Sequence, residues 1–338
     1  MSENYPIDFV VTWVDGNDPV WQAEKAKYSP NKNADNRNVR FRDWDNMQYW
    51  FRAVEKFAPW VNKIHFVTYG HLPKWLNTNN PKLNIAKHSD FIPQKYLPTF
   101  SSQPIELNLH RINGLAERFV YFNDDMFLLR PVKRELFFAG KDCLPTDFAI
   151  TSTISTTTKE DMMPFIKLNC VTILNGHFDK KEQMKKHFSK WVNLAYGWNA
   201  LRNLIFYGQH RFKGFANNHL AFSFLKSEYE DIWEKEYESL DDTSSHKFRS
   251  KLDLDNWLIR YWQLTRGNFY PIGRHVKGKV YEIYNGVEQN QELFKIIENQ
   301  AMPMICINDN DNVDFEPMKE RIKQAFNKIL PEKSSFEK

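Results

Sequence analysis

Short runs of β-branched and aromatic residues alternate with helical stripes through the first 128 residues of this 338-residue chain. The runs cover residues 7–14 (IDFVVTWV), 63–68 (KIHFVT) and 118–122 (RFVYF). Between them, apolar residues recur at helical spacing from Met47 to Phe57, and a second helix is expected from Pro104 to Ile112. This βαβ alternation predicts an α/β fold with a mainly parallel sheet flanked by helices.

The second half of the chain is expected to contain more helix than strand. A strand is predicted at Val171–Leu174, a basic helix at Lys180–Trp191 and a long helix from His219 to Leu240. A hairpin is expected around Lys277-Gly278-Lys279, followed by a last short strand at residues 304–307 (MICI). The pattern therefore predicts an α/β core over residues 1–150 and a helix-rich half over residues 151–338 that completes the core and the active site, so that the two form one catalytic domain.

A polar cluster, Asn123-Asp124-Asp125, directly follows the expected strand at residues 118–122. Asp15 ends the first strand in the same way, and the carboxyl ends of parallel strands meet at the sheet edge where ligands bind. Carboxylate and amide oxygens suit hard cations such as Mg²⁺ or Mn²⁺, and through a cation they suit a diphosphate. The alternative interpretation of the cluster is a solvated turn or a helix cap.

Further polar residues follow later apolar runs. His177 comes just after the expected strand at 171–174, and Asn308-Asp309 come after the last strand. The segment QHRFKGFANNH at residues 209–219 carries Arg211 and Lys213, which suit phosphate groups or are ordinary surface charge. Together these residues suit a metal-bound nucleotide diphosphate, and the chemistry alone does not separate phosphoryl transfer from glycosyl transfer.

The composition excludes several other classes of protein. With 46 basic and 42 acidic residues interspersed and a net charge of +4, the chain does not demand nucleic acid as a partner. Its three cysteines form no CxxC pair, and neither GxGxxG nor GxxxxGK[ST] occurs. The N-terminus lacks the features of a signal peptide and no apolar run approaches a spanning length, so a soluble, cytoplasmic protein is expected.

Long blocks of the sequence resemble the Stealth family of sugar-phosphate transferases. They are IDFVVTWVDGNDP at residues 7–19, the stretch from Arg40 to Leu128 (RFRDWDNMQYWF to RFVYFNDDMFL), and ICIND with the terminal KSSFE. The family includes bacterial capsule and cell-wall polysaccharide enzymes, and the animal N-acetylglucosamine-1-phosphotransferase is a relative. The resemblance implies transfer of a sugar 1-phosphate from a UDP-hexose or UDP-N-acetylhexosamine, bound by residues 1–150, to an acceptor hydroxyl, with release of UMP.

The resemblance also implies roles for particular residues. Asp124 and Asp125 would hold Mg²⁺ or Mn²⁺, Arg211 (or Lys213) would bind phosphate, and His177 or Asp125 would act as the base. The remaining positions expected to bind substrate are Asp15, Arg40, Arg42, Glu106, His110, Asn123, Asn308 and Asp309. The family's acidic residues that follow its arginine are replaced here by Asn217 and Asn218, which puts a carboxylate role there in doubt.

The acceptor is expected to be an oligosaccharide or a lipid-linked glycan. The basic tail from Phe315 and the basic stretch at residues 180–190 suggest peripheral association with the inner face of the plasma membrane. Two alternatives remain from the sequence. One is a metal-dependent glycosyltransferase that releases UDP, and the other is a non-catalytic carbohydrate-binding protein that uses its aromatic residues.

Overall fold

A computed structural model describes residues 5–29, 42–156, 158, 161–310 and 312–338. Its main sheet has five strands in the order β3-β2-β1-β4-β8. The strands are β1 (Ile7–Trp13), β2 (Ile64–Thr68), β3 (Leu83–Lys87), β4 (Arg118–Phe122) and β8 (Phe222–Leu225). The first four are parallel and β8 runs antiparallel to β4, which confirms the predicted mainly parallel sheet.

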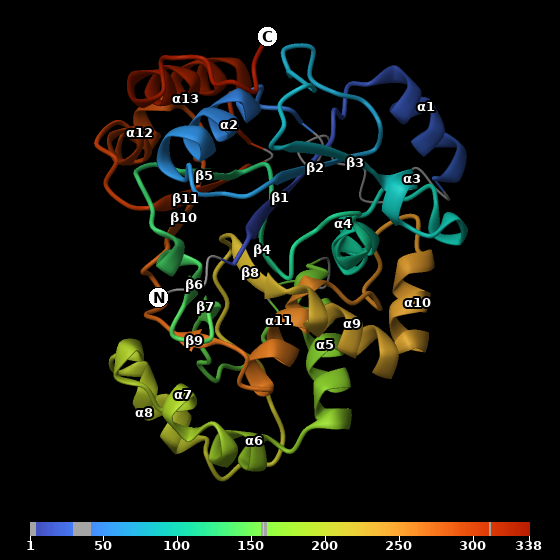
Figure 1. The fold of residues 1–338 in the computed structure, drawn as a ribbon, viewed down its shortest axis with the longest axis vertical. Coiled ribbons are helices and arrows are strands. Elements are labelled where there is room, and N and C mark those ends of the chain that lie inside the picture. The colour runs from blue at the N-terminus through green and yellow to red at the C-terminus, as the bar shows by residue number, and fades with distance from the viewer. Residues whose placement is uncertain (1–4, 30–41, 157, 159–160, 311) are drawn as a thin grey trace.

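Both faces of the main sheet are covered, as Figure 1 shows. Phe9 and Val11 of β1 pack with α2 (Met47–Phe57) and α13 (Phe315–Ile329), whereas Val10 packs with α5 (Met163–His177) and α11 (Asn256–Thr265) on the other face. A parallel strand buried on both faces has a continuous apolar sequence rather than an alternating one, as IDFVVTW does. The sheet edge at the carboxyl ends of these strands is therefore a fixed platform.

Two smaller sheets flank the main one. The first pairs β10 (Gly278–Glu282) with β11 (Met304–Asn308), and β11 with β5 (Met126–Leu128). Because β11 runs antiparallel to β5, the Ile307 amide donates to the Asp125 carbonyl at 2.9 Å. This pairing brings the polar residues after β11 beside those after β4. The second sheet comprises β6 (Phe138–Ala139), β7 (Leu144–Asp147) and β9 (Tyr270–Pro271).

The structure corrects three predictions of secondary structure. Residues 171–174 belong to α5, because Ile166, Cys170, Val171 and Leu174 recur at helical spacing and are all buried. The predicted helix from His219 begins instead with β8, whose backbone pairs with the open edge of β4. The predicted hairpin at 277–279 is wrong, since β10 pairs in parallel with β11.

Helices account for most of the remaining elements. The predicted helix at 104–112 is a short α4 followed by a 3-10 turn at Leu109–Arg111, and the basic helix at 180–191 is split into α6 and α7. The remaining helices are α1 (Pro19–Tyr28), α3 (His88–Phe91), α4 (Ser102–Leu107), α6 (Lys180–Lys186), α7 (Phe188–Trp191), α8 (Asn199–Ile205), α9 (Lys226–Lys235), α10 (Tyr237–Ser245) and α12 (Gln291–Glu298). Among the residues that the structure describes, no helix is both long and apolar enough to cross a membrane.

Candidate active site

A cavity of about 1060 Å³ opens at the carboxyl edge of the main sheet. Its walls include the residues that follow β1, β4 and β11, and the segment that precedes β8. Because β8 is antiparallel to β4, its N-terminal end lies at the edge where the parallel strands end. Four stretches far apart in the sequence therefore meet around one space.

Asp125 lies at the centre of the polar groups in this cavity. Its Oδ2 atom is 3.2 Å from the Cys306 Sγ atom and 3.5 Å from Nε2 of His219. Its Oδ1 atom is buried and has no hydrogen-bond partner among the described residues. A buried carboxylate oxygen without a partner is costly for folding, and it is an available ligand.

The neighbouring Asp124 is open to the cavity but surrounded by protein. This withdrawal from bulk water, with the nearby carboxylates of Asp125 and Asp43, raises the pKa of Asp124 to about 7. A cation bound between these carboxylates would relieve their mutual repulsion. The site thus holds negative charge that the described protein groups do not fully balance.

His219 lies beside Asp125 and Asn123, although the sequence analysis assigned it no role. Its Nε2 atom is 3.4 Å from the Asn123 amide nitrogen, and it approaches Asp125 as described above. Burial alone would lower its pKa, but the hydrogen bond and charge of Asp125 outweigh burial and raise the pKa of His219. The position of His219 just before a strand could have indicated a role in the site. The prediction of one helix over residues 219–240 missed that strand.

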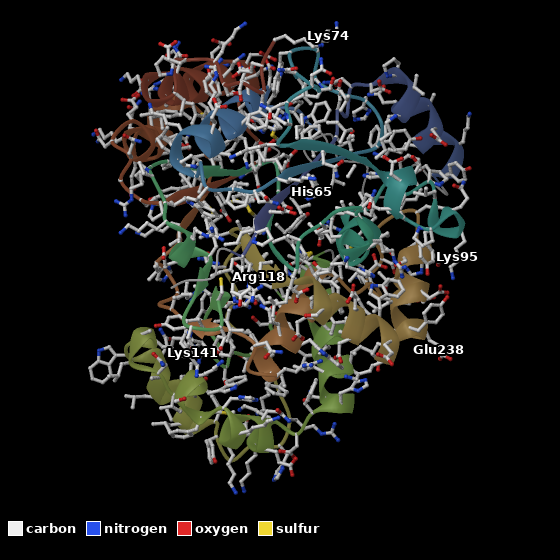
Figure 2. All side chains as sticks on the ribbon, in the orientation of Figure 1. His65, Lys74, Lys95, Arg118, Lys141 and Glu238 are labelled. Atoms are coloured by element: carbon white, nitrogen blue, oxygen red, sulfur yellow. The ribbon has the colours of Figure 1, made fainter. Side chains whose placement is uncertain are left out.

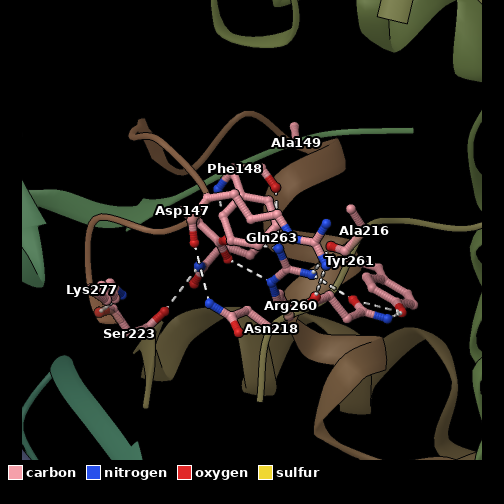
Figure 3. Close-up of polar contacts among 12 residues, drawn as sticks. Asp147, Phe148, Ala149, Ala216, Asn218, Ser223, Arg260, Tyr261, Gln263 and Lys277 are labelled. Carbon is pink, nitrogen blue, oxygen red and sulfur yellow. Dashed lines mark hydrogen bonds and ion pairs between the residues drawn. The ribbon is translucent and has the colours of Figure 1, made fainter. Parts of the chain in front are cut away.

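A buried ion pair fixes the segment that carries His219. Figure 3 shows Arg260 of α11 in contact with Asp147 at the end of β7, with donor–acceptor distances of 2.7 and 2.8 Å. Arg260 also donates to the Asn217 side-chain oxygen at 2.8 Å, and Tyr261 bonds to the same amide. The side chain of Asn217 therefore forms hydrogen bonds within the protein, and these bonds fix the backbone two residues before His219.

Positive groups line the cavity from several directions. Arg42 and Asp309 form a bidentate pair, with Nη2 to Oδ1 at 2.6 Å and Nε to Oδ2 at 3.1 Å. Arg249 and Lys167 also line the cavity, and neither forms an ion pair within the described ranges. Arg249 donates to the Ser102 hydroxyl at 3.2 Å. These two cations were not predicted, and neither has a carboxylate partner among the described residues that would neutralise it.

Two buried carboxyl groups complete the cavity wall. Burial raises the pKa of Glu106, and burial together with Glu106 raises the pKa of Asp255 to about 7. Asp255 also caps α11 by accepting from the Trp257 amide at 3.0 Å. Such carboxyl groups are suited to hydrogen-bond the hydroxyl groups of a sugar.

The structure brings only some of the predicted site residues together. Those that line the cavity are Arg42, Glu106, Asn123, Asp124, Asp125, Asn308 and Asp309. Arg40 lies outside the described residues. The predicted residues that lie elsewhere are Asp15, His110, His177, Arg211 and Lys213.

Three of the residues outside the cavity, His110, His177 and Arg211, have local structural partners. His110 is buried against Tyr229 and Trp233, and burial lowers its pKa to about 3. His177 ends α5 and bonds to Glu236 at 2.5 Å, whereas Arg211 donates to the Asn175 carbonyl at 2.9 Å. The structure therefore does not place His177 or Arg211 with Asp124 and Asp125.

The donor set of the cavity fits a hard divalent cation. Asp124 and Asp125 offer carboxylate oxygens, one of them buried and unpaired. Cys306 also lies within reach of Asp125 and His219, but burial raises the pKa of its thiol far above the ordinary value. A protonated thiol is a poor ligand, so the set favours oxygen coordination.

Comparison with known proteins gives a consistent result. The models "Stealth protein CR1, conserved region 1" and "Stealth protein CR2, conserved region 2" match residues 5–33 and 40–144. A capsular polysaccharide phosphotransferase, WcwK, of Streptococcus pneumoniae is 43% identical over 100% of both chains. A receptor polysaccharide phosphotransferase, WefC, of Streptococcus gordonii is 41% identical over 98% of both.

A solved structure of the galactosyltransferase LgtC, in complex with donor and acceptor sugar analogs, aligns over 95% of this chain and 96% of that one. Its TM-score is 0.37 at 9% identity. The full-length relatives carry the identification. The chain is a transferase enzyme of the phosphotransferase class. It belongs to the Stealth family, as the sequence blocks predicted.

Proposed function

We propose that this enzyme transfers a sugar 1-phosphate from a UDP-sugar to a hydroxyl group of a glycan, in the synthesis of a bacterial surface polysaccharide. The observation that carries the proposal is the joining of Asp124, Asp125, His219 and two unpaired cations around one cavity. Phosphoryl transfer needs charge neutralisation, alignment and a base, and these groups supply all three. The printed names of the relatives, capsular and receptor polysaccharide phosphotransferases, support the same activity.

In the proposed reaction the acceptor oxygen attacks the phosphorus that carries the sugar. The bond from this phosphorus to the bridging oxygen breaks, UMP leaves, and a phosphodiester links the sugar to the acceptor. Asp124 and Asp125 would hold Mg²⁺ or Mn²⁺, which when bound neutralises diphosphate charge. Arg249 and Lys167, which line the cavity, would bind phosphate oxygens.

His219 is the base in this proposal. Asp125 beside it raises the imidazole pKa, so neutral His219 is a stronger base towards the acceptor hydroxyl. The buried carboxyl groups of Glu106 and Asp255 would bind sugar hydroxyl groups. Roles for His177 and Arg211 stay predictions, because both lie outside the cavity.

The released nucleotide tests the proposal. The enzyme is incubated with a panel of UDP-sugars, Mg²⁺ and capsule-type oligosaccharides, and the products are separated by chromatography. We expect UMP, and only when an acceptor is present. Release of UDP instead would overturn sugar-phosphate transfer and identify a metal-dependent glycosyltransferase. The Arg249→Met variant, which keeps an unbranched apolar stem but loses the charged guanidinium, should weaken donor binding.

A further inference from the structure

In the segment from α7 to α8, large apolar side chains are exposed and a polar side chain is buried, which is the reverse of the usual arrangement. Leu194 is 96% exposed, Trp198 is 87% exposed and Ile205 is 76% exposed. On α8 itself, Leu201 and Leu204 are also exposed, whereas Asn203 is fully buried. Figure 2 shows side chains standing away from this part of the ribbon into solvent. Contiguous exposed apolar residues of this size mark an interaction surface.

Asn203 holds this inverted helix in its orientation. Its amide nitrogen donates to the carbonyls of Ala149 at 2.6 Å and Trp191 at 2.5 Å, and its oxygen accepts from the Thr151 amide at 2.8 Å. Rotating α8 to bury its leucines would break all three hydrogen bonds inside the protein. The exposed apolar surface is therefore a fixed feature of the fold.

Positive charge surrounds this apolar surface. Residues 180–205 contain six basic residues and one acidic residue, Glu182. Lys180 and Lys190 donate to the backbone carbonyls of Phe206 and Gly267. The four that remain exposed are Lys181, Lys185, Lys186 and Arg202. Figure 1 shows α6, α7 and α8 together at the lower end of the molecule.

We infer that this surface, residues 181–205, docks on an anionic lipid bilayer. Leucine, isoleucine and tryptophan side chains would enter the interface between headgroups and acyl chains, while the lysines meet lipid phosphates. Charge decides against a second copy of this chain, because a symmetric contact would set the same cations against one another. The inference rests on this surface alone and is independent of the reaction in the cavity.

Vesicle binding tests the inference with the full chain. Vesicles made of phosphatidylglycerol and phosphatidylcholine in equal parts are sedimented with the protein, and pure phosphatidylcholine vesicles serve as the uncharged comparison. We expect binding to the anionic vesicles that weakens in high salt. The combined variant Leu194→Ser, Trp198→Ser, Ile205→Ser should bind at least about tenfold more weakly, since each residue loses its apolar contact with lipid.

Two further variants make the test specific. Val20→Ser removes an apolar residue that is 70% exposed on α1, at the opposite end of the molecule in Figure 1, and should leave vesicle binding unchanged. Replacing Lys181, Lys185 and Lys186 by glutamate should abolish the preference for anionic lipid. The triple serine variant and the triple glutamate variant should both release nucleotide at the wild-type rate with a soluble acceptor. That result would show that this surface acts separately from the cavity.

Three results would overturn the inference. The first is a wild-type protein that does not sediment with anionic vesicles. The second is equal binding by the wild type and the variant with three serines. The third is a wild-type dimer, measured by light scattering, that the serine variant dissociates, because the surface would then join two copies of this chain.

Discussion

The cavity at the edge of the main sheet and the surface of α7 and α8 depart from ordinary folding in opposite ways. In the cavity, carboxyl groups such as Glu106 and Asp255 are withdrawn from water. On the surface, Leu194 and Trp198 are left in water. Both arrangements destabilise the chain on its own, and both are relieved when a matching partner binds. The contrast matches the two proposals, a cation with phosphates for the cavity and lipid for the surface.

The largest expected effect is on the cavity side of this comparison. Asp125→Asn should lower turnover on the order of a thousandfold, because it removes a proposed metal ligand and the charge beside His219. Cooperative thermal unfolding should be retained. The exposed Asp142→Asn variant is the matched control and should keep full activity. Turnover within tenfold of the wild type would remove Asp125 from the mechanism.

For the surface of α7 and α8, the largest effect on stability is expected from the buried amide of Asn203 rather than from the exposed apolar side chains. Asn203→Ala should lower the free energy of unfolding by about 3 kcal/mol, since three buried backbone groups lose their partner. Asn199→Ala, on the exposed side of the same helix, should change it by about 0.5 kcal/mol or less. Denaturant unfolding measures both, and equal losses would refute the anchoring role of Asn203.

Two histidine variants test which histidine acts in the cavity. His219→Asn should lower turnover by roughly a hundredfold, as expected for loss of a general base, whereas His177→Asn should have little effect. In the wild type, activity should rise with pH as His219 loses its proton and becomes able to act as a base. That rise should be absent from the residual activity of His219→Asn. The opposite pattern between the two histidines would restore the role that the sequence suggested for His177.

The smallest expected effect concerns the buried Asp255. Its folded pKa is about 7 against an ordinary value of 3.8, so the folded protein binds the extra proton between these values. Wild-type stability should therefore fall as pH rises from about 4 to about 7. Asp255→Asn should remove this decline and be more stable than the wild type by about 1–2 kcal/mol at pH 8. Urea unfolding across this pH range checks it, and a difference that does not vary with pH would contradict it.

The sequence predicted the first part of the fold well because its local patterns agree with the final packing. β1, β2 and β4 are apolar runs between clear turns, and their parallel pairing follows from the helices between them. The polar residues that follow β4 and β11, with Arg42 and Glu106, come together in the cavity, whereas Asp15 after β1 does not line it. Strand ends converge by topology, so these placements needed no knowledge of distant contacts.

The rest of the site depends on contacts that local sequence does not encode. Phe222, Leu225 and Tyr229 have helical spacing, yet residues 222–225 form β8 because the edge of β4 offers backbone partners. This pairing brings His219 into the cavity. The β-branched residues of 171–174 join a helix because its buried stripe packs against α11. Arg249 lies in a segment without a periodic pattern, so only the fold reveals its place.

The pair between Arg42 and Asp309 joins positions that are 267 residues apart in the chain. β11, which precedes Asp309, also forms the backbone contact that supports Asp125. While the chain is being made on the ribosome, Arg42 and the acidic cluster after β4 emerge long before β11 and Asp309 exist. A nascent chain therefore has no complete cavity until synthesis has passed the last strand, and it cannot act on a substrate before then.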